Sequence, residues 1–431
     1  MRVLIDYRPA LRERSGSGEY THQLAKALLG AFPAGEGPHA LDLTLFSSSW
    51  KDRLEPPADL PGAAVVDRRM PVRLLNLAWH RLGWPPAETL AGGPFDVVHS
   101  PHPLLTPARD AAQVITIHDL NFLTHPERTR AEIRRDYPAL ARDHAQRAGA
   151  ILVPSAYTAG EVERRLGVPR ERMAVCPPGA PDWSPRQAAP KDGYVLCFGT
   201  LEPRKNIGGL LDAWERLLGS RDGLKAVPYE PGNQPRSYDA PGNQPRSYDA
   251  HGNQPRSYDA PGDRPLPYVG DGLQAVPELV LAGRATDEAK PWLDRINAAP
   301  LLGHVRHLGY VDAAARRALY EGARLLVMPS FDEGFGLPVL EAMTLGVPVV
   351  AANRGSLPEV LGGAGLLVDP DRPDDLAHAI ATMLGDEGLA AASAAKGIAR
   401  ARDFRWDATA RLVYDTYQRA IDRRAQAPRS V

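Results

Sequence analysis

The chain has 431 residues, of which 43% are hydrophobic and 24% charged, a balance typical of a globular protein. Since single hydrophobic cores stop growing at about 250–300 residues, this length predicts two domains of about 150–200 residues each. The formal net charge of −1 argues against a nucleic-acid-binding protein, because such proteins usually carry a marked basic excess. The two cysteines, Cys176 and Cys197, exclude a disulfide framework and predict a reducing compartment.

The N-terminus shows no targeting segment. Residues 1–6 have the pattern of a strand and lack the apolar region of a signal peptide. No apolar run approaches the ~18 residues that are needed to span a bilayer. We therefore expect a cytoplasmic protein whose contact with a membrane, if it has one, is peripheral.

Short apolar runs alternate with helical patterns along both halves of the chain. They are Val3–Ile5, Leu41–Phe46, Val97–His99, Val114–Ile117 and Ile151–Val153 in the first half, and Val195–Phe198, Leu279–Ala282, Val305–Leu308, Leu325–Met328 and Val347–Ala351 in the second. Compact apolar strands separated by helices are typical of parallel sheets covered on both faces. The pattern predicts an α/β fold with two Rossmann-like, doubly wound domains.

A glycine-containing loop with Gly16 and Gly18 follows the first strand and precedes a helix predicted at Tyr20–Leu29. Such a loop lets the backbone approach a ligand closely. It lacks the full Gly-x-Gly-x-x-Gly fingerprint, which argues against a simple NAD enzyme.

Residues 72–84 form an amphipathic segment that carries arginines together with Trp79 and Trp84. One hypothesis is a helix that rests on a membrane surface or meets a lipid-linked acceptor. The alternative is an ordinary helix that packs on its own domain. Further along, His118 and Asp119 end another predicted strand, where an imidazole beside an acid can contact a ligand.

The domain boundary is predicted from a stretch rich in Pro and Gly between Cys176 and Pro190, which neither a helix nor a strand would cross. We place an N-terminal domain at residues 1–178, a linker at 179–192 and a C-terminal domain at 193–404. In the remaining segment, 405–431, a helix predicted at Asp407–Arg423 has an apolar face that we expect to pack back towards the N-terminal domain.

A ten-residue unit, Pro-Gly-Asn-Gln-Pro-Arg-Ser-Tyr-Asp-Ala, occurs three times between residues 231 and 260, with His251 replacing the proline of the third copy. This composition buries too little apolar surface to offset the entropy of ordering. The flanks Asp222–Pro228 and Asp271–Pro277 resemble each other, so we expect a disordered, repeat-expanded insertion at about 222–270. A neutral passenger and a tyrosine-bearing docking tether both remain open.

Two stretches of the second half have the chemistry of a ligand site. Arg204 and Lys205 follow the strand Val195–Phe198, and the carboxyl ends of such strands are where open α/β sheets bind ligands. Arginine can hold a diphosphate by two parallel hydrogen bonds, and lysine adds a point charge. An isolated basic pair on the surface is the alternative.

The second stretch runs from Pro329 to Met343, where a strand is followed by a glycine-containing turn and a helix predicted to start near Leu337. Backbone N–H groups at a helix start attract anions. Glu333 in the turn and Glu341 in the helix could accept hydrogen bonds from hydroxyl groups. The combination suits a ligand with phosphates and sugar hydroxyls, although paired glutamates are often only surface residues.

These motifs together resemble glycosyltransferase family 4, with Gly199–Asn206, Pro329–Met343, Gly346–Val350 and Gly355–Val360 carrying the resemblance. Seven residues separate Glu333 from Glu341, as in the paired-glutamate motif of that family. The resemblance implies the GT-B fold and transfer with retention of the anomeric configuration. The first half looks most like bacterial mannosyltransferases of surface-polysaccharide assembly.

The resemblance also implies roles for individual residues. Arg204 and Lys205 would hold the donor diphosphate, Glu333 would accept hydrogen bonds from hydroxyls of the transferred sugar, and His118 would contact this sugar near the reacting carbon. Glu341 would accept hydrogen bonds from the ribose. The other residues expected around the donor are Gly16, Gly18, Gly199, Thr200, Tyr310, Val311, Gly334, Phe335, Gly336 and Leu337.

The implied function is transfer of a hexose, with mannose from GDP-mannose preferred, to a glycan or lipid-linked acceptor. No cofactor or metal is expected, since two cationic side chains and a helix start would neutralise the diphosphate, and Asp369 and Asp371 lie in a Pro-containing turn. The alternatives are a UDP-hexose-dependent enzyme of the same family, a sugar-nucleotide epimerase and a catalytically silent sugar-nucleotide-binding protein. The charged motifs argue against the epimerase and against a silent protein.

Overall fold

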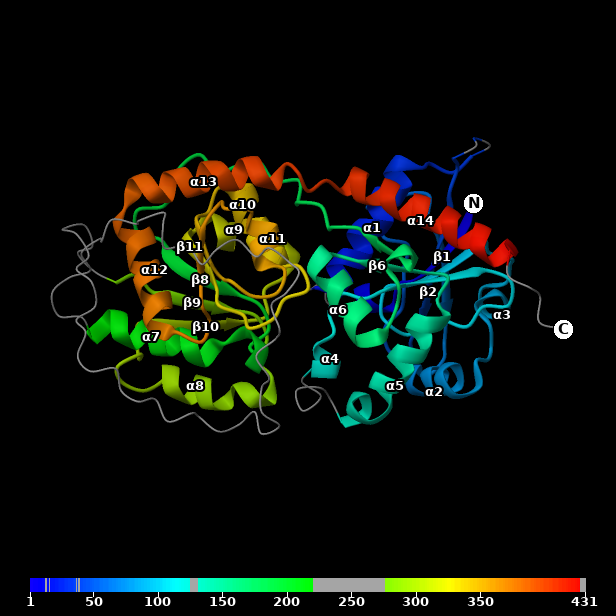
Figure 1. The fold of residues 1–431 in the computed structure, drawn as a ribbon, viewed down its shortest axis with the longest axis horizontal. Helices are drawn as coiled ribbons and strands as arrows, with labels where there is room; N and C mark the ends of the chain where they lie inside the picture. The colour runs from blue at the N-terminus through cyan, green and yellow to red at the C-terminus, as the bar shows by residue number, and fades with distance from the viewer. Residues whose placement is uncertain are drawn as a thin grey trace.

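The computed structural model describes residues 1–11, 14, 16–35, 37, 39–124, 131–219 and 276–426 of the chain. They form two α/β domains that lie side by side along the long axis of the molecule (Figure 1). Each domain contains one parallel sheet with helices on both faces, so the predicted fold class is confirmed. The insertion expected at about 222–270 lies outside the described residues.

The N-terminal sheet has the strand order β3-β2-β1-β4-β5-β6-β7. Its strands are β1 (Arg2–Asp6), β2 (Asp42–Ser48), β3 (Ala64–Arg68), β4 (Val97–Ser100), β5 (Ala112–Thr116), β6 (Ala150–Val153) and β7 (Met173–Val175). The order reverses direction between β1 and β4, which leaves the crevice at which doubly wound sheets bind ligands. The edge strands β3 and β7 were not predicted from the sequence, and both are only partly buried.

The C-terminal sheet has the strand order β10-β9-β8-β11-β12-β13. Its strands are β8 (Tyr194–Phe198), β9 (Leu279–Ala282), β10 (Val305–Gly309), β11 (Ala323–Met328), β12 (Val349–Ala352) and β13 (Leu366–Val368). Successive side chains of β8 enter opposite cores: Val195 and Cys197 pack on one face of the sheet and Leu196 on the other. Burial on both faces explains why these strands are recognisable as apolar runs.

The helices cover the sheets, and some of them begin at a residue whose side chain caps the helix. Those before the linker are α1 (Ser17–Ala31), α2 (Val72–Leu82), α3 (Ala87–Ala91), α4 (Asn121–Thr124), α5 (Ala131–Arg147) and α6 (Ala156–Leu166). Those after it are α7 (Ile207–Gly219), α8 (Lys290–Ile296), α9 (Ala313–Glu321), α10 (Leu337–Leu345), α11 (Leu357–Leu361), α12 (Pro373–Gly385), α13 (Glu387–Ala401) and α14 (Trp406–Gln426). The side chains of Ser155 and Asp312 cap α6 and α9 by accepting hydrogen bonds from backbone N–H groups.

The last helix, α14, crosses back and packs on the N-terminal domain, as Figure 1 shows. Val413 and Tyr417 are buried in the same core cluster as Val3 and Leu24. The hydroxyl of Tyr417 also lies 2.7 Å from Nδ1 of His99, a fully buried residue of β4. The helix is therefore part of the N-terminal core, although it follows the whole C-terminal domain in the chain.

Candidate active site

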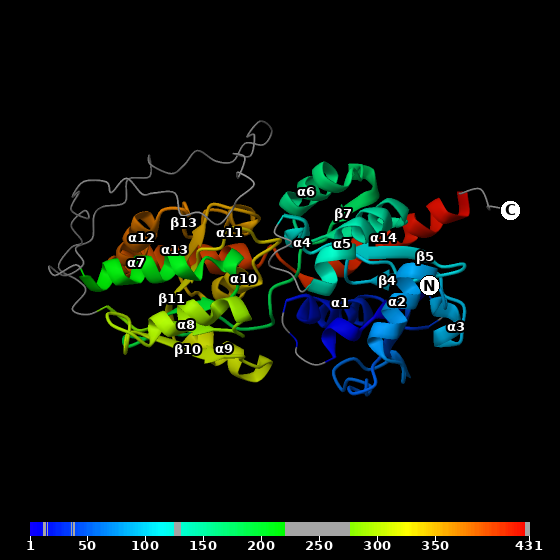
Figure 2. The ribbon, with the colours of Figure 1, turned by 90° about the horizontal axis from the view of Figure 1, so that it is seen from below.

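The two domains meet through loops that follow the carboxyl ends of their strands. Figure 2 shows α1, α4 and α6 of the N-terminal domain on the side that faces α10 and α11 of the C-terminal domain. The motifs singled out from the sequence lie in these loops and helix starts. The site therefore draws side chains from both domains.

Glu333 is the centre of a buried ionic cluster. Its side chain accepts hydrogen bonds from Nζ of Lys205 at 2.5 Å and from Nη1 of Arg204 at 3.1 Å, and the residue is only 6% exposed. Burial raises the pKa of Glu333, but the charges of Lys205 and Arg204 outweigh burial and lower this pKa to about 2. The structure thus brings together three of the four predicted catalytic residues, with Glu333 ionised at neutral pH.

Arg204 is held by further contacts that set its orientation. Its Nε donates to Oε1 of Glu202 at 2.6 Å, and its Nη1 also lies 3.2 Å from the backbone oxygen of Asp332. The backbone oxygen of Arg204 accepts a hydrogen bond from the N–H of Phe331, which ties the two loops together. Within the described part of the chain these contacts use Nε and Nη1, which leaves the Nη2 amino group for a further acceptor.

Glycines shape the loop that leads into α10. Gly336 adopts φ 96°, a left-handed conformation that L side chains rarely adopt, and this turn places Leu337 at the first position of the helix. A Cβ on Gly355 would lie 2.7 Å from backbone atoms of Glu333, so the chain passes close to the ionic cluster there. The buried ring of Phe335 packs edge-on against Phe404 and supports the loop from behind.

At Gly334 the two domains are in close contact. A Cβ on this residue would lie 1.8 Å from the backbone oxygen of His118 in the other domain. The carbonyl oxygen of Gly334 accepts hydrogen bonds from the hydroxyls of Ser155 at 2.7 Å and Thr158 at 3.0 Å, both at the start of α6. A side chain at position 334 is incompatible with this packing.

Two further contacts join the domains beside Gly334. The carboxylate of Glu359 on α11 accepts hydrogen bonds from the backbone N–H groups of Ala156 and Tyr157, at the N-terminus of α6. The hydroxyl of Tyr157 donates to Asp332 at 3.0 Å. Burial, together with the nearby charge of Asp119, raises the pKa of Asp332 to about 6.

His118 follows β5 and faces this junction. Its Nε2 lies 3.3 Å from the backbone oxygen of Pro101, and its ring meets the edge of Tyr20 at a centroid distance of 4.9 Å. Burial lowers the pKa of His118 to about 4, so the imidazole is neutral at pH 7. A neutral imidazole can contact a sugar hydroxyl but contributes no positive charge to the site.

Glu341 on α10 is paired with a residue that the sequence analysis missed. Nη1 of Arg316, on α9, lies 3.4 Å from Oε1 of Glu341, and Nη2 of the same guanidinium lies 3.3 Å from Oε1 of Glu19. Glu19 is in the first turn of α1, directly after the loop with Gly16 and Gly18. No sequence pattern signals this contact, because three separate helices supply its members and α1 lies about 300 residues before the other two.

The remaining predicted residues surround these clusters. Gly16 is the N-cap of α1 with φ 52°, and Gly18 is buried in the first turn of that helix. Gly199 follows β8 close to the Lys205 side chain, and Thr200 continues the same loop. Tyr310, after β10, is 39% exposed, with the guanidinium of Arg284 5.5 Å from its ring centroid. Val311 is partly buried against the core of the C-terminal domain.

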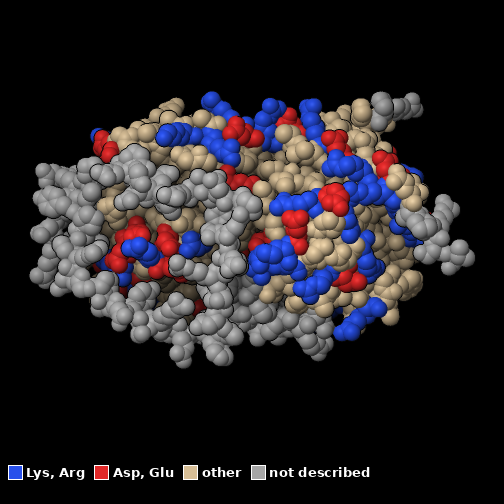
Figure 3. Space-filling model, viewed as in Figure 1, with Lys and Arg blue, Asp and Glu red and all other residues tan. Residues whose placement is uncertain are grey.

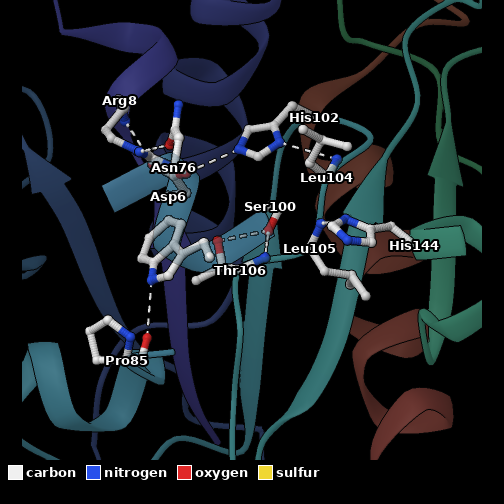
Figure 4. A network of polar contacts seen from close by, with 11 residues as sticks. Asp6, Arg8, Asn76, Pro85, Ser100, His102, Leu104, Leu105, Thr106 and His144 are labelled. Atoms are coloured by element: carbon white, nitrogen blue, oxygen red, sulfur yellow. Dashed lines mark hydrogen bonds and ion pairs between the residues drawn. The ribbon is translucent and has the colours of Figure 1, made fainter. Parts of the chain in front are cut away.

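A second polar network lies at the carboxyl edge of the N-terminal sheet (Figure 4). Asp6, at the end of β1, is fully buried and pairs with Arg8 and, at 3.0 Å, with Nε2 of His102. Arg8 also donates to the side chain of Asn76 on α2 at 2.8 Å. Burial alone would raise the pKa of Asp6, but Arg8 and His102 hold this pKa well below its ordinary value. The network ties α2 to the ligand-facing edge of this sheet.

Most of the amphipathic segment 72–84 forms the helix α2, Val72–Leu82. Only one of the two tryptophans of the segment is accessible. Trp79 is buried at 3% exposure and donates a hydrogen bond to the backbone oxygen of Pro85, whereas Trp84 is 63% exposed. Trp79 therefore belongs to the core, and of the two tryptophans only Trp84 is available for the hypothesised contact with a membrane. No helix among the described residues is long and apolar enough to cross a bilayer.

Both halves of the chain are similar to known glycosyltransferases. The model of the family described as Glycosyltransferase Family 4 matches residues 14–182, and that described as Glycosyl transferases group 1 matches residues 271–386. The O-antigen chain mannosyltransferase B of Escherichia coli is 31% identical over 324 residues, which cover 72% of this chain and 71% of that relative. A D-inositol 3-phosphate glycosyltransferase of Corynebacterium glutamicum (strain R) is 41% identical over 106 residues, or 24% of this chain and 25% of that relative.

Solved structures with the same architecture span nearly the whole chain. The sucrose-phosphate synthase of Thermosynechococcus elongatus superposes with a TM-score of 0.66 at 19% identity, covering 97% of this chain and 98% of that structure. Anabaena HepE, solved in complex with UDP and glucose, superposes with a TM-score of 0.59 at 16% identity, covering 97% and 99%. Together with the sequence relatives, these likenesses show that the chain belongs to glycosyltransferase family 4 and is a glycosyltransferase with the GT-B fold.

Proposed function

We propose that this enzyme transfers mannose from GDP-mannose to a glycan or lipid-linked acceptor, with retention of the anomeric configuration. The observation that carries the proposal is the buried cluster of Lys205, Arg204 and Glu333 at the carboxyl edge of the C-terminal sheet. The 31% identity to a mannosyltransferase over 72% of the chain supports the choice of sugar.

In this proposal the donor diphosphate lies between the loop after β8 and the start of α10. Nη2 of Arg204 and Nζ of Lys205 would donate to phosphate oxygens, together with the backbone N–H groups of Gly336 and Leu337, since the first N–H groups of a helix lack intrahelical partners. Glu202 and Glu333 already pair with the two cations, so both side chains are oriented before the donor arrives. This preorganisation favours the charge that develops on the leaving diphosphate.

The transfer itself needs no dedicated base in this proposal. The acceptor oxygen forms a bond to the anomeric carbon from the face that the nucleotide leaves, while the bond from that carbon to the phosphate oxygen breaks. The acceptor proton passes to an oxygen of the departing diphosphate, which balances the charges. His118, neutral at pH 7, and Glu333, ionised, would hold hydroxyls of the sugar on either side of that carbon.

We also propose that the donor binds without a metal ion. Lys205, Arg204 and the start of α10 supply the positive potential that a divalent cation would otherwise give. Asp369 and Asp371 form the Asp-x-Asp sequence of the chain, and both carboxylates lie within 3.5 Å of Arg354. Their negative charges are therefore already paired with the Arg354 guanidinium.

The test is a calorimetric screen of the purified protein against GDP-mannose, UDP-glucose, UDP-N-acetylglucosamine and the free nucleotides, with EDTA present. We expect GDP-mannose to bind and the variant that combines Arg204→Ala with Lys205→Ala to lose this binding. A control variant combines Lys290→Ala with Arg372→Ala, two exposed cations of the same domain, and it should bind as the wild type does.

Each outcome of the screen has a defined meaning. Binding of a UDP-hexose instead of GDP-mannose would replace the proposed donor and leave the proposed diphosphate site intact. Binding that requires a divalent cation would contradict the metal-free site. The absence of binding to every nucleotide sugar would contradict the proposed donor site.

A lipid-linked acceptor is favoured by the exposed face of α2. Leu74 and Leu77 are 62% and 58% exposed and lie one turn apart on the helix, and Trp84, 63% exposed, follows the end of the helix, whereas Leu75 and Trp79 face the core. The exposed Arg73 and Arg81 lie on the same helix, and Figure 3 shows Lys and Arg side chains gathered over the N-terminal domain. Apolar side chains beside arginines suit a peripheral contact with an anionic membrane surface.

Liposome co-sedimentation tests this contact. We expect the protein to pellet with vesicles that contain anionic lipid, and Leu77→Asp to reduce the pelleted fraction severalfold. Leu302→Asp is the matched control, because Leu302 is 63% exposed on the other domain. Equal pelleting of all three proteins would argue against a membrane contact through α2.

A further inference from the structure

Arg316 connects the two domains at the proposed nucleotide site. Its guanidinium reaches Glu341 of its own domain at 3.4 Å and Glu19 of the facing domain at 3.3 Å. All three side chains are at most 12% exposed. Charges so far from solvent are costly to bury, so this arrangement requires that the three groups satisfy one another or a ligand.

The cluster has spare capacity for a ligand. Two carboxylates share a single guanidinium, so their oxygens retain lone pairs for hydroxyl donors. Burial raises the pKa of Glu341, and Arg316 opposes that rise. Nε of Arg316 is buried and has no hydrogen-bond partner among the residues that the structure describes. A sugar hydroxyl, which both donates and accepts, matches these requirements.

Glu19 connects the cluster to the start of α1, where Gly16 and Gly18 lie. It lies in the first turn of α1, and its Oε1 also accepts a hydrogen bond from the side chain of Gln23 at 2.8 Å, which fixes its orientation. Gly16, the N-cap of α1, and Gly18, in its first turn, immediately precede it. A displacement of the Arg316 guanidinium would therefore affect both Glu341, on the nucleotide side of the site, and Glu19, on the opposite side.

We infer that Arg316 is a positioning residue that couples recognition of the donor ribose by Glu341 to the placement of the start of α1 by Glu19. This inference rests on the proposed function, because it assigns the ribose to Glu341. The arginine acts through both carboxylates: it orients Glu341 for the ribose hydroxyls and holds Glu19, with the first turn of α1, across the site.

Donor binding, measured calorimetrically with GDP-mannose, tests the coupling in a double-mutant cycle of Arg316→Met and Glu19→Gln. Glu19→Gln is nearly isosteric and alters the domain opposite the nucleotide, yet we expect it to weaken donor binding about tenfold. Arg316→Met should weaken binding at least as much, and the double variant should bind no worse than Arg316→Met alone. Arg317→Met is the matched control, because the neighbouring Arg317 is 45% exposed and pairs only within its helix.

A purely structural role would give another result. If Arg316 only stabilised the fold, Glu19→Gln would lower the melting temperature without changing donor affinity, and this result would overturn the inference. Independent, multiplying effects of the two substitutions would also overturn it while leaving the proposed function in place. Failure of the wild type to bind any nucleotide sugar would overturn both. A normal melting temperature of Glu19→Gln together with weakened donor binding would support the coupling.

Discussion

Nζ of Lys205 lies 2.5 Å from Oε1 of Glu333, so the proposed diphosphate-binding lysine and the proposed sugar-binding glutamate form one buried ion pair. A change of Glu333 leaves Lys205 buried without its counter-charge, and a change of Lys205 leaves Glu333 with Arg204 as its remaining cation. This relationship has consequences for stability as well as for activity.

Glu333→Gln should destabilise the protein at neutral pH by about 3 kcal/mol, because it leaves Lys205 buried without its counter-charge. The pKa of Glu333 is lowered from 4.5 to about 2 in the folded protein, so its contribution to stability is present above pH 4.5 and is lost as the pH falls towards 2. The difference in unfolding free energy between wild type and variant should therefore be constant from pH 8 to 5 and shrink below that range. Urea titrations at each pH measure it, with the exposed Glu387→Gln as control. A difference that stays constant down to pH 3 would contradict the assignment.

The contribution of Asp332 to the stability of the fold should have the opposite dependence on pH. Its pKa is raised from 3.8 to about 6, so the folded protein binds more protons than the unfolded chain between these values and loses stability as the pH rises through them. Asp332→Asn keeps an oxygen that can accept from Tyr157 and removes the charge that faces Asp119. We expect this variant to be more stable than the wild type at pH 7.5 and equal to it near pH 4. Thermal unfolding at both pH values provides the measurement, and a variant less stable at pH 7.5 would refute the prediction.

Gly334→Ala should abolish the domain contact at the centre of the site. Its Cβ would overlap the backbone oxygen of His118, which belongs to the other domain, so the domains must separate to accommodate it. We expect transferase activity to fall by at least about a hundredfold, since small displacements of reacting groups have effects of this size, while circular dichroism shows both domains folded. Gly30→Ala, in α1 with open space around it, should retain full activity. Near-normal activity of Gly334→Ala would mean that the described junction does not form during catalysis.

Tyr417→Phe should destabilise the N-terminal domain without affecting donor binding. The substitution leaves Nδ1 of the fully buried His99 without the hydroxyl that lies 2.7 Å away, at a cost of about 1–3 kcal/mol. Tyr414→Phe is the matched control on the same helix, because its ring keeps the stack on Phe32. Denaturant unfolding and calorimetry separate the two effects. A loss of donor affinity in Tyr417→Phe would show that α14 acts on the site and not only on the core.

Much of this fold was predictable because parallel strands are buried on both faces. Val195–Phe198 and Leu279–Ala282 are continuous apolar runs for that reason, and the structure has strands at both. The edge strand Ala64–Arg68 was not predicted, since it is only partly buried and its short apolar run ends in the charged pair Asp67 and Arg68. Burial in the sheet interior marks the sequence strongly, whereas pairing at an edge does not.

The candidate site was predictable where its residues follow the carboxyl ends of strands that are recognisable in the sequence. Arg204 and Lys205 follow one strand and Glu333 follows another, so the rule that ligands bind at carboxyl ends brings them together. The contact of Arg316 with Glu19 joins residues about 300 positions apart in the chain, and helical periodicity alone does not specify such a partner. The burial of Trp79 was also not predictable, because an amphipathic pattern does not show which of the two tryptophans faces the core.

The return of α14 to the first domain has a consequence for the order in which the protein matures. During synthesis, residues 1–175 emerge first, but their core lacks Val413 and Tyr417 until almost the whole chain has left the ribosome. The C-terminal sheet is complete at Val368 and can fold earlier. The domain translated first is therefore the domain finished last, and until then its exposed apolar surface is a target for chaperones.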